Sequence, residues 1–220
     1  MKNARVFALV LALCLMLTAL CPAVLADSAP DINARNAIVI DMNTGTVLYE
    51  KDADSRVPPA STTKIMTLLL VCEAVERGDI KLNDVVTAQK ADLELHDDDA
   101  STVKIKPGEK LSLNDLLYCA MLVSANDACN VIAQHISGSI SAFVERMNRR
   151  ALQLGMKDTR FVNCTGLDDG EDAAEHLSSA ADIAIMSREL LKHDGIRKYT
   201  TIWMDSIRGG QFGLTNTNKL

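Results

Sequence analysis

Residues 61–77 of this chain, STTKIMTLLLVCEAVER, decide how it folds. Apolar side chains dominate the part after Lys64 and leave almost no polar face, which is the pattern of a helix buried on all sides. Gly78 follows directly and suits the position just past a helix C-terminus, where the backbone often turns left-handed. The stretch therefore predicts a central, buried helix against which the rest of the chain packs.

The first four residues of that stretch carry a chemical pattern, S-x-x-K. Ser61 and Lys64 are three positions apart, so on a helix they share one face and the amine can lie beside the hydroxyl. A serine becomes a good nucleophile when a base takes its proton, and a lysine can be that base when burial lowers its pKa. The helix start also offers free N–H groups and a positive dipole end to a developing oxyanion. The pattern predicts a nucleophilic serine; a capping serine beside an unrelated lysine is the alternative.

Two other short motifs bear on this choice. Ser101-Thr102-Val103-Lys104 repeats the S-x-x-K spacing, but the stretch alternates like a strand, where positions i and i+3 point to opposite faces. Ser124-Ala125-Asn126 falls at a predicted break between two helices, where a loop can aim a hydroxyl and an amide toward Ser61. A helix cap is the alternative for this second motif, because Ser and Asn both favour that place.

The remaining pattern is a hairpin followed by many helices. Strands are predicted over residues 36–41 and 46–50, with a turn at Gly45 where a positive φ suits glycine. Further helices are expected over residues 112–121 (with Ser112 as N-cap), from the break to 135, over 143–154 (closed by Gly155) and from a cap at 177–179 to 191. A two-stranded hairpin is marginal alone, and no further strand is evident after Ile202.

Five stretches resemble the serine-type D-alanyl-D-alanine carboxypeptidases, the low-molecular-mass penicillin-binding proteins, of which S-x-x-K is one mark. They are residues 56–67 (RVPPASTTKIMT), 123–128 (VSANDA), 161–167 (FVNCTGL), 176–182 (HLSSAAD) and 216–220 (NTNKL). The resemblance spans roughly residues 36–220. It implies an α+β fold of the β-lactamase/transpeptidase type, in which an antiparallel sheet is flanked by a helical cluster.

The resemblance also implies roles for single residues. Ser61 would attack the carbonyl between the two terminal D-alanines of a peptidoglycan stem peptide; D-alanine would leave, and water would resolve the acyl-enzyme. Lys64 would be the general base, Ser124 would relay protons, and Asn126 would bind the substrate backbone. Penicillins and other β-lactam antibiotics imitate the dipeptide and would acylate Ser61. No cofactor and no metal are implied.

One motif of that family does not occur. The family carries K-T-G on a strand that lines the other side of the cleft, and the 220 residues contain no K-T-G. The stretch at residues 216–220 normally comes shortly before that strand. We therefore expect the sheet and the active site to be incomplete here, and the fragment alone to have little activity. We likewise expect these 220 residues not to include the C-terminal β domain and the amphipathic anchor, by which many relatives reach the membrane surface.

The N-terminal residues 1–26 have the pattern of a secretory signal peptide. Lys2 and Arg5 precede an apolar run over residues 6–20, and Val24-Leu25-Ala26 offers a cleavage site. The run is shorter than the roughly 20 apolar residues that a membrane span needs. An uncleaved anchor and a lipoprotein cut before Cys21 are the alternatives. We expect residues 27–220 to be the catalytic domain, exported to the extracytoplasmic face of a bacterial membrane or to the periplasm.

Composition narrows the remaining possibilities. With 23 Lys and Arg against 29 Asp and Glu, the net charge of −6 gives no basic excess for binding nucleic acid. The four histidines are scattered and no C-x-x-C occurs, so a zinc site has little support. After the signal segment four cysteines remain, at positions 72, 119, 129 and 164. Two disulfides in three pairings are open to them, and buried free thiols are the preferred interpretation.

Three other functions share parts of this pattern. A class A β-lactamase would show S-D-N in place of Ser124-Ala125-Asn126 and an E-x-x-L-N loop, which does not occur. A non-catalytic penicillin sensor or wall-binding module would be expected to lose the nucleophile or its base, and both are retained. An esterase on the same scaffold would differ in its substrate alone.

Overall fold

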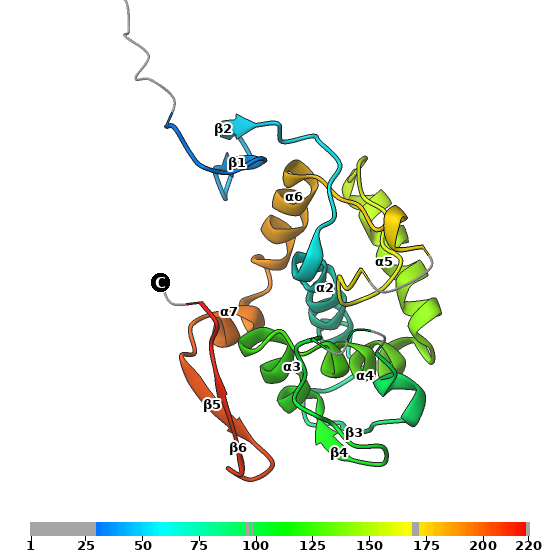
Figure 1. Cartoon of the computed structure of the whole chain (residues 1–220). Coiled ribbons are helices and arrows are strands. Elements are labelled where there is room, and N and C mark those ends of the chain that lie inside the picture. The colour runs from blue at the N-terminus through cyan, green and yellow to red at the C-terminus, as the bar shows by residue number, and fades with distance from the viewer. Residues whose placement is uncertain (1–29, 96, 98, 169–171, 219–220) are drawn as a thin grey trace, which may run out of the picture. The chain divides into compact units, whose positions relative to one another are not determined.

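The computed structural model describes residues 30–95, 97, 99–168 and 172–218 (Figure 1). The chain divides into two units, Met1–Asn33 and Ala34–Leu220, and the second contains every helix and strand of the described residues. The predicted signal segment, residues 1–26, lies outside the described residues. No helix within the described ranges is long and apolar enough to cross a membrane.

Helix α2, Lys64–Glu76, is the centre of the second unit. Its residues Met66, Leu69, Leu70 and Val71 are at most 1% exposed, which confirms the predicted buried helix. A 3₁₀ turn, Ala60–Thr63, precedes it, so Ser61 lies on this tighter turn and the α-helix proper begins at Lys64. Gly78 has a φ of +78° and ends the helix as expected.

Five more helices surround α2. They are α3 (Leu113–Leu122), α4 (Asn126–Ser137), α5 (Ile140–Leu154), α6 (Ala180–Leu190) and α7 (Asp194–Thr200). Figure 1 shows α2 among them, and α4, α5 and α6 contact it directly. The predicted caps are confirmed: the Ser112 and Ser179 side chains accept hydrogen bonds from the third helical residues of α3 and α6. Helix α5 begins three residues before its predicted start, and α7 was not expected.

The strands form three separate antiparallel pairs. They are β1 (Ala37–Ile40) with β2 (Val47–Lys51), β3 (Val85–Thr87) with β4 (Lys110–Ser112), and β5 (Met204–Ile207) with β6 (Phe212–Thr215). Short 3₁₀ turns also occur at Lys90–Leu93 and Ala173–Glu175. The first pair confirms the predicted hairpin, and Arg188 of α6 donates hydrogen bonds to two carbonyls of its turn.

The expectation of no strand after Ile202 is wrong. The last pair forms there because the alternating pattern of β5 and β6 buries Ile207 and Leu214, both at most 2% exposed, against α3. The turn between them uses positive φ values at Arg208, Gly209 and Gly210. Because this pair stands apart from β1 and β2, the described residues contain no sheet larger than two strands, as expected for an incomplete sheet.

The stretch at residues 101–106, whose sequence alternates like a strand, does not form a strand. The segment is extended, but the carboxylate of Asp127 accepts the N–H groups of Val103 and Ile105 in place of a neighbouring strand. Lys104 lies between them with a φ of +54°, which breaks the alternation. The four cysteines of the described residues are unpaired, and all but the half-buried Cys72 are fully buried.

Candidate active site

The S-x-x-K motif places the amine of Lys64 beside the hydroxyl of Ser61. Lys64 Nζ lies within hydrogen-bond distance of Ser61 Oγ, at 3.0 Å, because the 3₁₀ turn and the first turn of α2 stack positions i and i+3. The lysine is only 4% exposed, and its second partner is the carbonyl of Thr165, at 2.8 Å. No carboxylate of the described residues forms an ion pair with it.

This setting favours a neutral amine. Burial is the main cause that lowers the pKa of Lys64, and ionised thiols at Cys129 and Cys164 would act against it. Burial, however, raises the pKa of Cys129 to about 12 and raises that of Cys164 as well, so both are uncharged thiols at neutral pH. The lowering by burial is then unopposed, which is the condition a lysine needs in order to act as a base.

Ser124 contacts the hydroxyl of Ser61 as well. Its hydroxyl donates to Ser61 Oγ over 3.1 Å, so Ser61 Oγ lies between a buried amine and a second hydroxyl. Ser124 has a φ of +55°, a left-handed conformation that is strained for a residue with a side chain. The structure thus brings together three of the four residues that the sequence singled out, and their catalytic roles stay predictions.

Asn126, the fourth of these residues, lies close by but is engaged elsewhere. It is the first residue of α4, and both its backbone N–H and its Nδ2 donate to the carbonyl of Ser101, at 2.8 and 3.1 Å. Its Oδ1 is buried without a hydrogen-bond partner in the described structure. A buried acceptor of this kind is open to a donor that arrives with a ligand.

The serine of the second S-x-x-K turns out to support the site. Besides binding Asn126 through its carbonyl, Ser101 donates from Oγ to the carbonyl of Val123 over 2.6 Å. These bonds hold the residues on both sides of the strained Ser124. No hydrogen bond joins Ser101 to the side chain of Lys104 in the described residues, so the second motif is not a nucleophile–base pair. The strand-like alternation of residues 101–104 had indicated that Ser101 and Lys104 do not form a pair. No feature of the sequence indicated that Ser101 supports the active site.

Thr165, the carbonyl partner of Lys64, is set by a tight turn within the FVNCTGL stretch. Asn163 Oδ1 accepts hydrogen bonds from the N–H groups of Thr165 and Gly166 and from the Thr165 hydroxyl. Gly166 has a φ of +88°, and a Cβ built there would lie 1.8 Å from the carbonyl oxygen of Ala60. The turn can therefore approach the residue before Ser61 only because glycine stands at this position.

We expect Gly166→Ala to lower the free energy of unfolding by at least about 2 kcal/mol, because the left-handed backbone and the contact with Ala60 both oppose a methyl group. Urea unfolding of the purified protein measures the loss. Gly155→Ala is the matched control: Gly155 also has a positive φ, +77°, but a Cβ there meets nothing within 4 Å. Equal losses in the two variants would show that the close approach does not matter.

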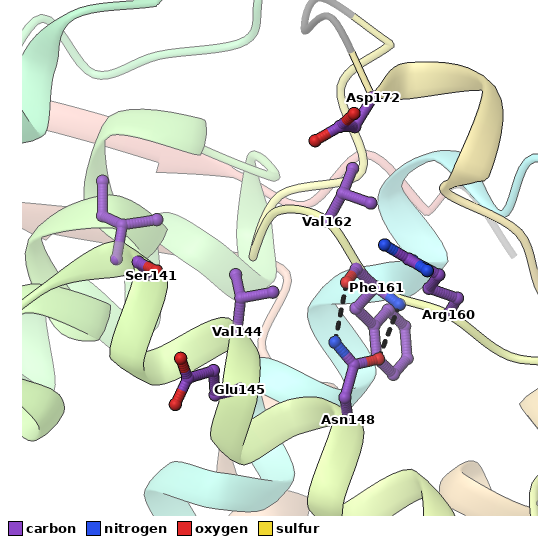
Figure 2. A pocket seen from close by; sticks show the side chains of 9 residues that line it. Ser141, Val144, Glu145, Asn148, Arg160, Phe161, Val162 and Asp172 are labelled. Atoms are coloured by element: carbon purple, nitrogen blue, oxygen red, sulfur yellow. Dashed lines mark hydrogen bonds between the residues drawn. The ribbon is translucent and has the colours of Figure 1, made fainter.

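A pocket of about 320 Å³ opens beside Ser61, Lys64 and Ser124. Its other walls are largely apolar and come from α2, α3, α6 and the end of α7; they include Ile65, Met121 and Leu190. A second pocket, of about 620 Å³, lies between α5 and residues 160–162 and shares no residue with the first (Figure 2). In Figure 2, Asn148 forms two hydrogen bonds with the backbone of Phe161, at 2.8 and 2.9 Å.

Comparisons with known proteins identify the family of this chain. The profile of the family described as D-alanyl-D-alanine carboxypeptidase matches residues 23–220. The D-alanyl-D-alanine carboxypeptidase DacF of Bacillus subtilis is 41% identical over 190 residues, which are 85% of this chain and 47% of that protein.

Solved structures are similar over most of the chain. The structure of penicillin binding protein 6B of Escherichia coli superimposes on this one with a TM-score of 0.80 and is 30% identical in sequence. The match covers 89% of this chain and 61% of the chain of penicillin binding protein 6B. The structure of the peptidoglycan synthesis regulatory factor PBP3 of Streptococcus pneumoniae gives a TM-score of 0.79 and 33% sequence identity. The match covers 86% of this chain and 55% of the PBP3 chain. These likenesses confirm the expected α+β, transpeptidase-like fold.

The chain spans less than half the length of curated relatives such as DacF of Bacillus subtilis, DacC of Escherichia coli and DacA of Haemophilus influenzae. The residues that match the family profile, 23–220, include Ser61, Lys64, Ser124 and the turn at Thr165. On the family profile and the fold together, this chain belongs to the D-alanyl-D-alanine carboxypeptidase family.

Proposed function

We propose that the full-length gene product is a serine D-alanyl-D-alanine carboxypeptidase that acts on peptidoglycan stem peptides and binds penicillins. The observation that supports this most directly is the position of Ser61 Oγ, 3.0 Å from the amine of Lys64 and 3.1 Å from the hydroxyl of Ser124. A nucleophile within hydrogen-bond reach of a base, with a second group that can pass on a proton, is the arrangement of acyl transfer.

In this proposal the reaction has two halves. The neutral amine of Lys64 takes the proton of Ser61 Oγ as the oxygen attacks the carbonyl carbon of the penultimate D-alanine. The C–N bond then breaks, the proton passes through Ser124 to the leaving amine, and D-alanine departs. Water next attacks the ester on Ser61 and restores the free hydroxyl, with the same groups moving protons in the reverse sense.

Substrate binding would use the open side of the pocket. The unpartnered Oδ1 of Asn126 is an acceptor for a backbone N–H of the stem peptide. A β-lactam ring would place its carbonyl at the same point, so that ring opening leaves a penicilloyl ester on Ser61. Both ligands are thus attacked by one hydroxyl, and no cofactor is needed for either.

The same proposal includes a place outside the cytoplasm. Residues 1–26 would act as the secretory signal and residues 27–220 as part of the catalytic domain, because peptidoglycan stem peptides lie beyond the cytoplasmic membrane. Sequencing the N-terminus of the mature protein tests this: cleavage after Ala26 would leave Asp27 first.

The activity is tested with the purified full-length gene product and a peptide that ends in D-Ala-D-Ala. We expect release of free D-alanine, none from the L-Ala-L-Ala analogue, and inhibition by penicillin. A protein that takes up penicillin but releases no D-alanine would instead be a sensor or wall-binding module. Rapid turnover of penicillin itself would identify a β-lactamase.

The rate of penicillin acylation should rise with pH. Lys64 must be neutral in order to accept the proton of Ser61, and its pKa lies below the ordinary value of 10.5 because of burial. The rate constant is therefore expected to increase as the pH rises through this lowered pKa and to level off above it, at a pH below 10.5. Stopped-flow measurements between pH 5 and 10 follow the change. A rate constant that does not vary with pH over this range would contradict a titrating base.

A further inference from the structure

His176 is a buried histidine that joins two parts of the active-site framework. It is 0% exposed. Its Nε2 lies 2.7 Å from the hydroxyl oxygen of Thr63, and its Nδ1 accepts the N–H of Val162 at 3.0 Å. The ring of Phe161 lies next to it, tilted by 59°, with ring centroids 5.9 Å apart. Both ring nitrogens are thus engaged, each by a different segment.

These contacts fix the form of the ring. A backbone N–H can only donate, so Nδ1 must be without a proton in order to accept from Val162. A neutral imidazole then carries its proton on Nε2 and donates it to Thr63 Oγ1. A protonated ring would have N–H groups at both nitrogens, and the contact with Val162 would become one donor against another.

His176 joins two segments that form a hydrogen bond with each other: one carries the amine of Lys64 and the other carries the carbonyl of Thr165. Thr63 directly precedes Lys64 at the start of α2. Val162 leads into the turn whose Thr165 carbonyl accepts from Lys64 Nζ over 2.8 Å. One residue earlier the backbone of Phe161 is already fixed by Asn148 (Figure 2). His176 therefore lies where it can set the position of the Thr165 carbonyl relative to the amine.

That position matters for a base. A neutral amine has two N–H groups and one lone pair, and a hydrogen bond from one N–H to the Thr165 carbonyl helps to turn the lone pair toward Ser61. If the carbonyl moves, the lone pair loses this orientation. Displacements of about 1 Å in an active site can lower rates by about 100-fold.

We propose that His176 is a positioning residue that, in its neutral form alone, holds the Thr165 carbonyl against Lys64, so that protonation of the ring slows acylation of Ser61. The proposal rests on the proposed function, because it concerns the same acylation step. His176 touches neither Ser61 nor the pocket beside it, so its effect would pass through Lys64.

The surroundings of the ring keep it neutral at physiological pH. Burial is the main cause that lowers the pKa of His176, and the charge of Asp168 opposes it more weakly. The ring's contacts on the 3₁₀ turn and on residues 161–162 are Thr63, Phe161 and Val162, which carry no charge. On its own segment, the neighbouring Glu175 is paired with Arg160 at 2.8 Å. Since the pKa lies below 6.5, the protonated ring should become populated only as the pH falls below that value.

The experiment compares the full-length protein with His176→Gln and His176→Ala, using the rate constant of acylation by a fluorescent penicillin between pH 4.5 and 8.5. Glutamine carries one acceptor and one donor and does not titrate in this range. We expect the ratio of parent to His176→Gln rate constants to be constant above the pKa of His176 and to fall up to tenfold per pH unit below it. Above the pKa of His176, His176→Ala should acylate about 10- to 100-fold more slowly than the parent, with Ser61 still the labelled residue.

Two measurements keep the outcomes separate. The ¹⁵N resonances of His176 in the parent give its tautomer and its pKa, and the extra loss of rate should have the same midpoint. Because a lowered histidine pKa also makes stability fall on acidification, thermal unfolding is recorded at each pH and rates are used only where the protein is folded.

The proposal is overturned if the parent-to-His176→Gln ratio stays constant through the measured ring titration, or if folded His176→Ala acylates like the parent above the pKa of His176. If the variants do not fold, the parent protein alone tests the proposal. Its acylation rate should then show a second decrease at low pH, with the same midpoint as the measured titration of the His176 ring, and a different midpoint would overturn the proposal. A parent protein that forms no adduct at Ser61 at any pH would refute the proposed function instead, which is a different result.

Discussion

Ser61→Ala should abolish covalent labelling by fluorescent penicillin. The adduct is an ester on the Ser61 oxygen, and no other hydroxyl of the described residues lies within hydrogen-bond reach of the buried amine. The measurement is gel fluorescence of the full-length protein, followed by mass spectrometry of the peptide that carries the label. In the parent protein, the label is expected on the peptide that contains Ser61.

Two serine variants serve as comparisons. Ser141→Ala changes an exposed serine of α5 at the second pocket, and its labelling should match the parent. Ser101→Ala removes the other S-x-x-K serine, whose hydroxyl is bonded to the Val123 carbonyl; the adduct should still form, because Ser61 is intact. A label that persists in Ser61→Ala and disappears in Ser101→Ala would overturn the assignment of the nucleophile.

Lys64→Ala should slow acylation by about 10²–10⁴-fold, the usual contribution of a positioned general base. Its amine is the only group that contacts both Ser61 Oγ and the Thr165 carbonyl in the described structure, so no neighbour is placed to replace it. The residual rate should also lose the rise with pH seen in the parent. Stopped-flow acylation over the same pH range provides both results.

The matched control for this change is Lys104→Ala, the exposed lysine of the other S-x-x-K. Its rate constant should stay within about twofold of the parent, since Lys104 is exposed and does not line the pocket beside Ser61. Thermal unfolding of both variants shows whether a slower rate results from the missing amine or from a protein that is no longer folded. If folded Lys64→Ala acylates at the parent's rate at neutral pH, another group must be the base.

Local patterns predicted the helices and the first hairpin well. The buried helix after Ser61, the cap at Ser112 and the turn at Gly45 follow from periodicity and from single-residue conformational preferences, which act within a few neighbouring residues. The pairing of Ser61 with Lys64 belongs to the same class, because three positions along one helical face fix the approach of hydroxyl and amine.

Sequence patterns did not predict the secondary structure correctly where contacts with distant segments determine it. The stretch at residues 102–106 alternates like a strand, yet its N–H groups are taken by the Asp127 side chain. Helix α7 is short and contains Gly195, and it is held by contacts such as the hydrogen bond from the Tyr199 hydroxyl to Asn114. The last hairpin depends on burial against α3, which periodicity in a four-residue strand does not reveal.

The sequence by itself therefore determined the central helix, the serine and lysine on its first turn, and the family to which the whole pattern is similar. Tertiary structure alone decided what surrounds that pair: the Thr165 carbonyl on the amine, the Ser101 bonds around Ser124, and the buried ring of His176 between Thr63 and Val162. The reason is physical. Helical periodicity is set by neighbouring residues, whereas these contacts join residues that lie from 14 to 113 positions apart and meet only when the helices pack.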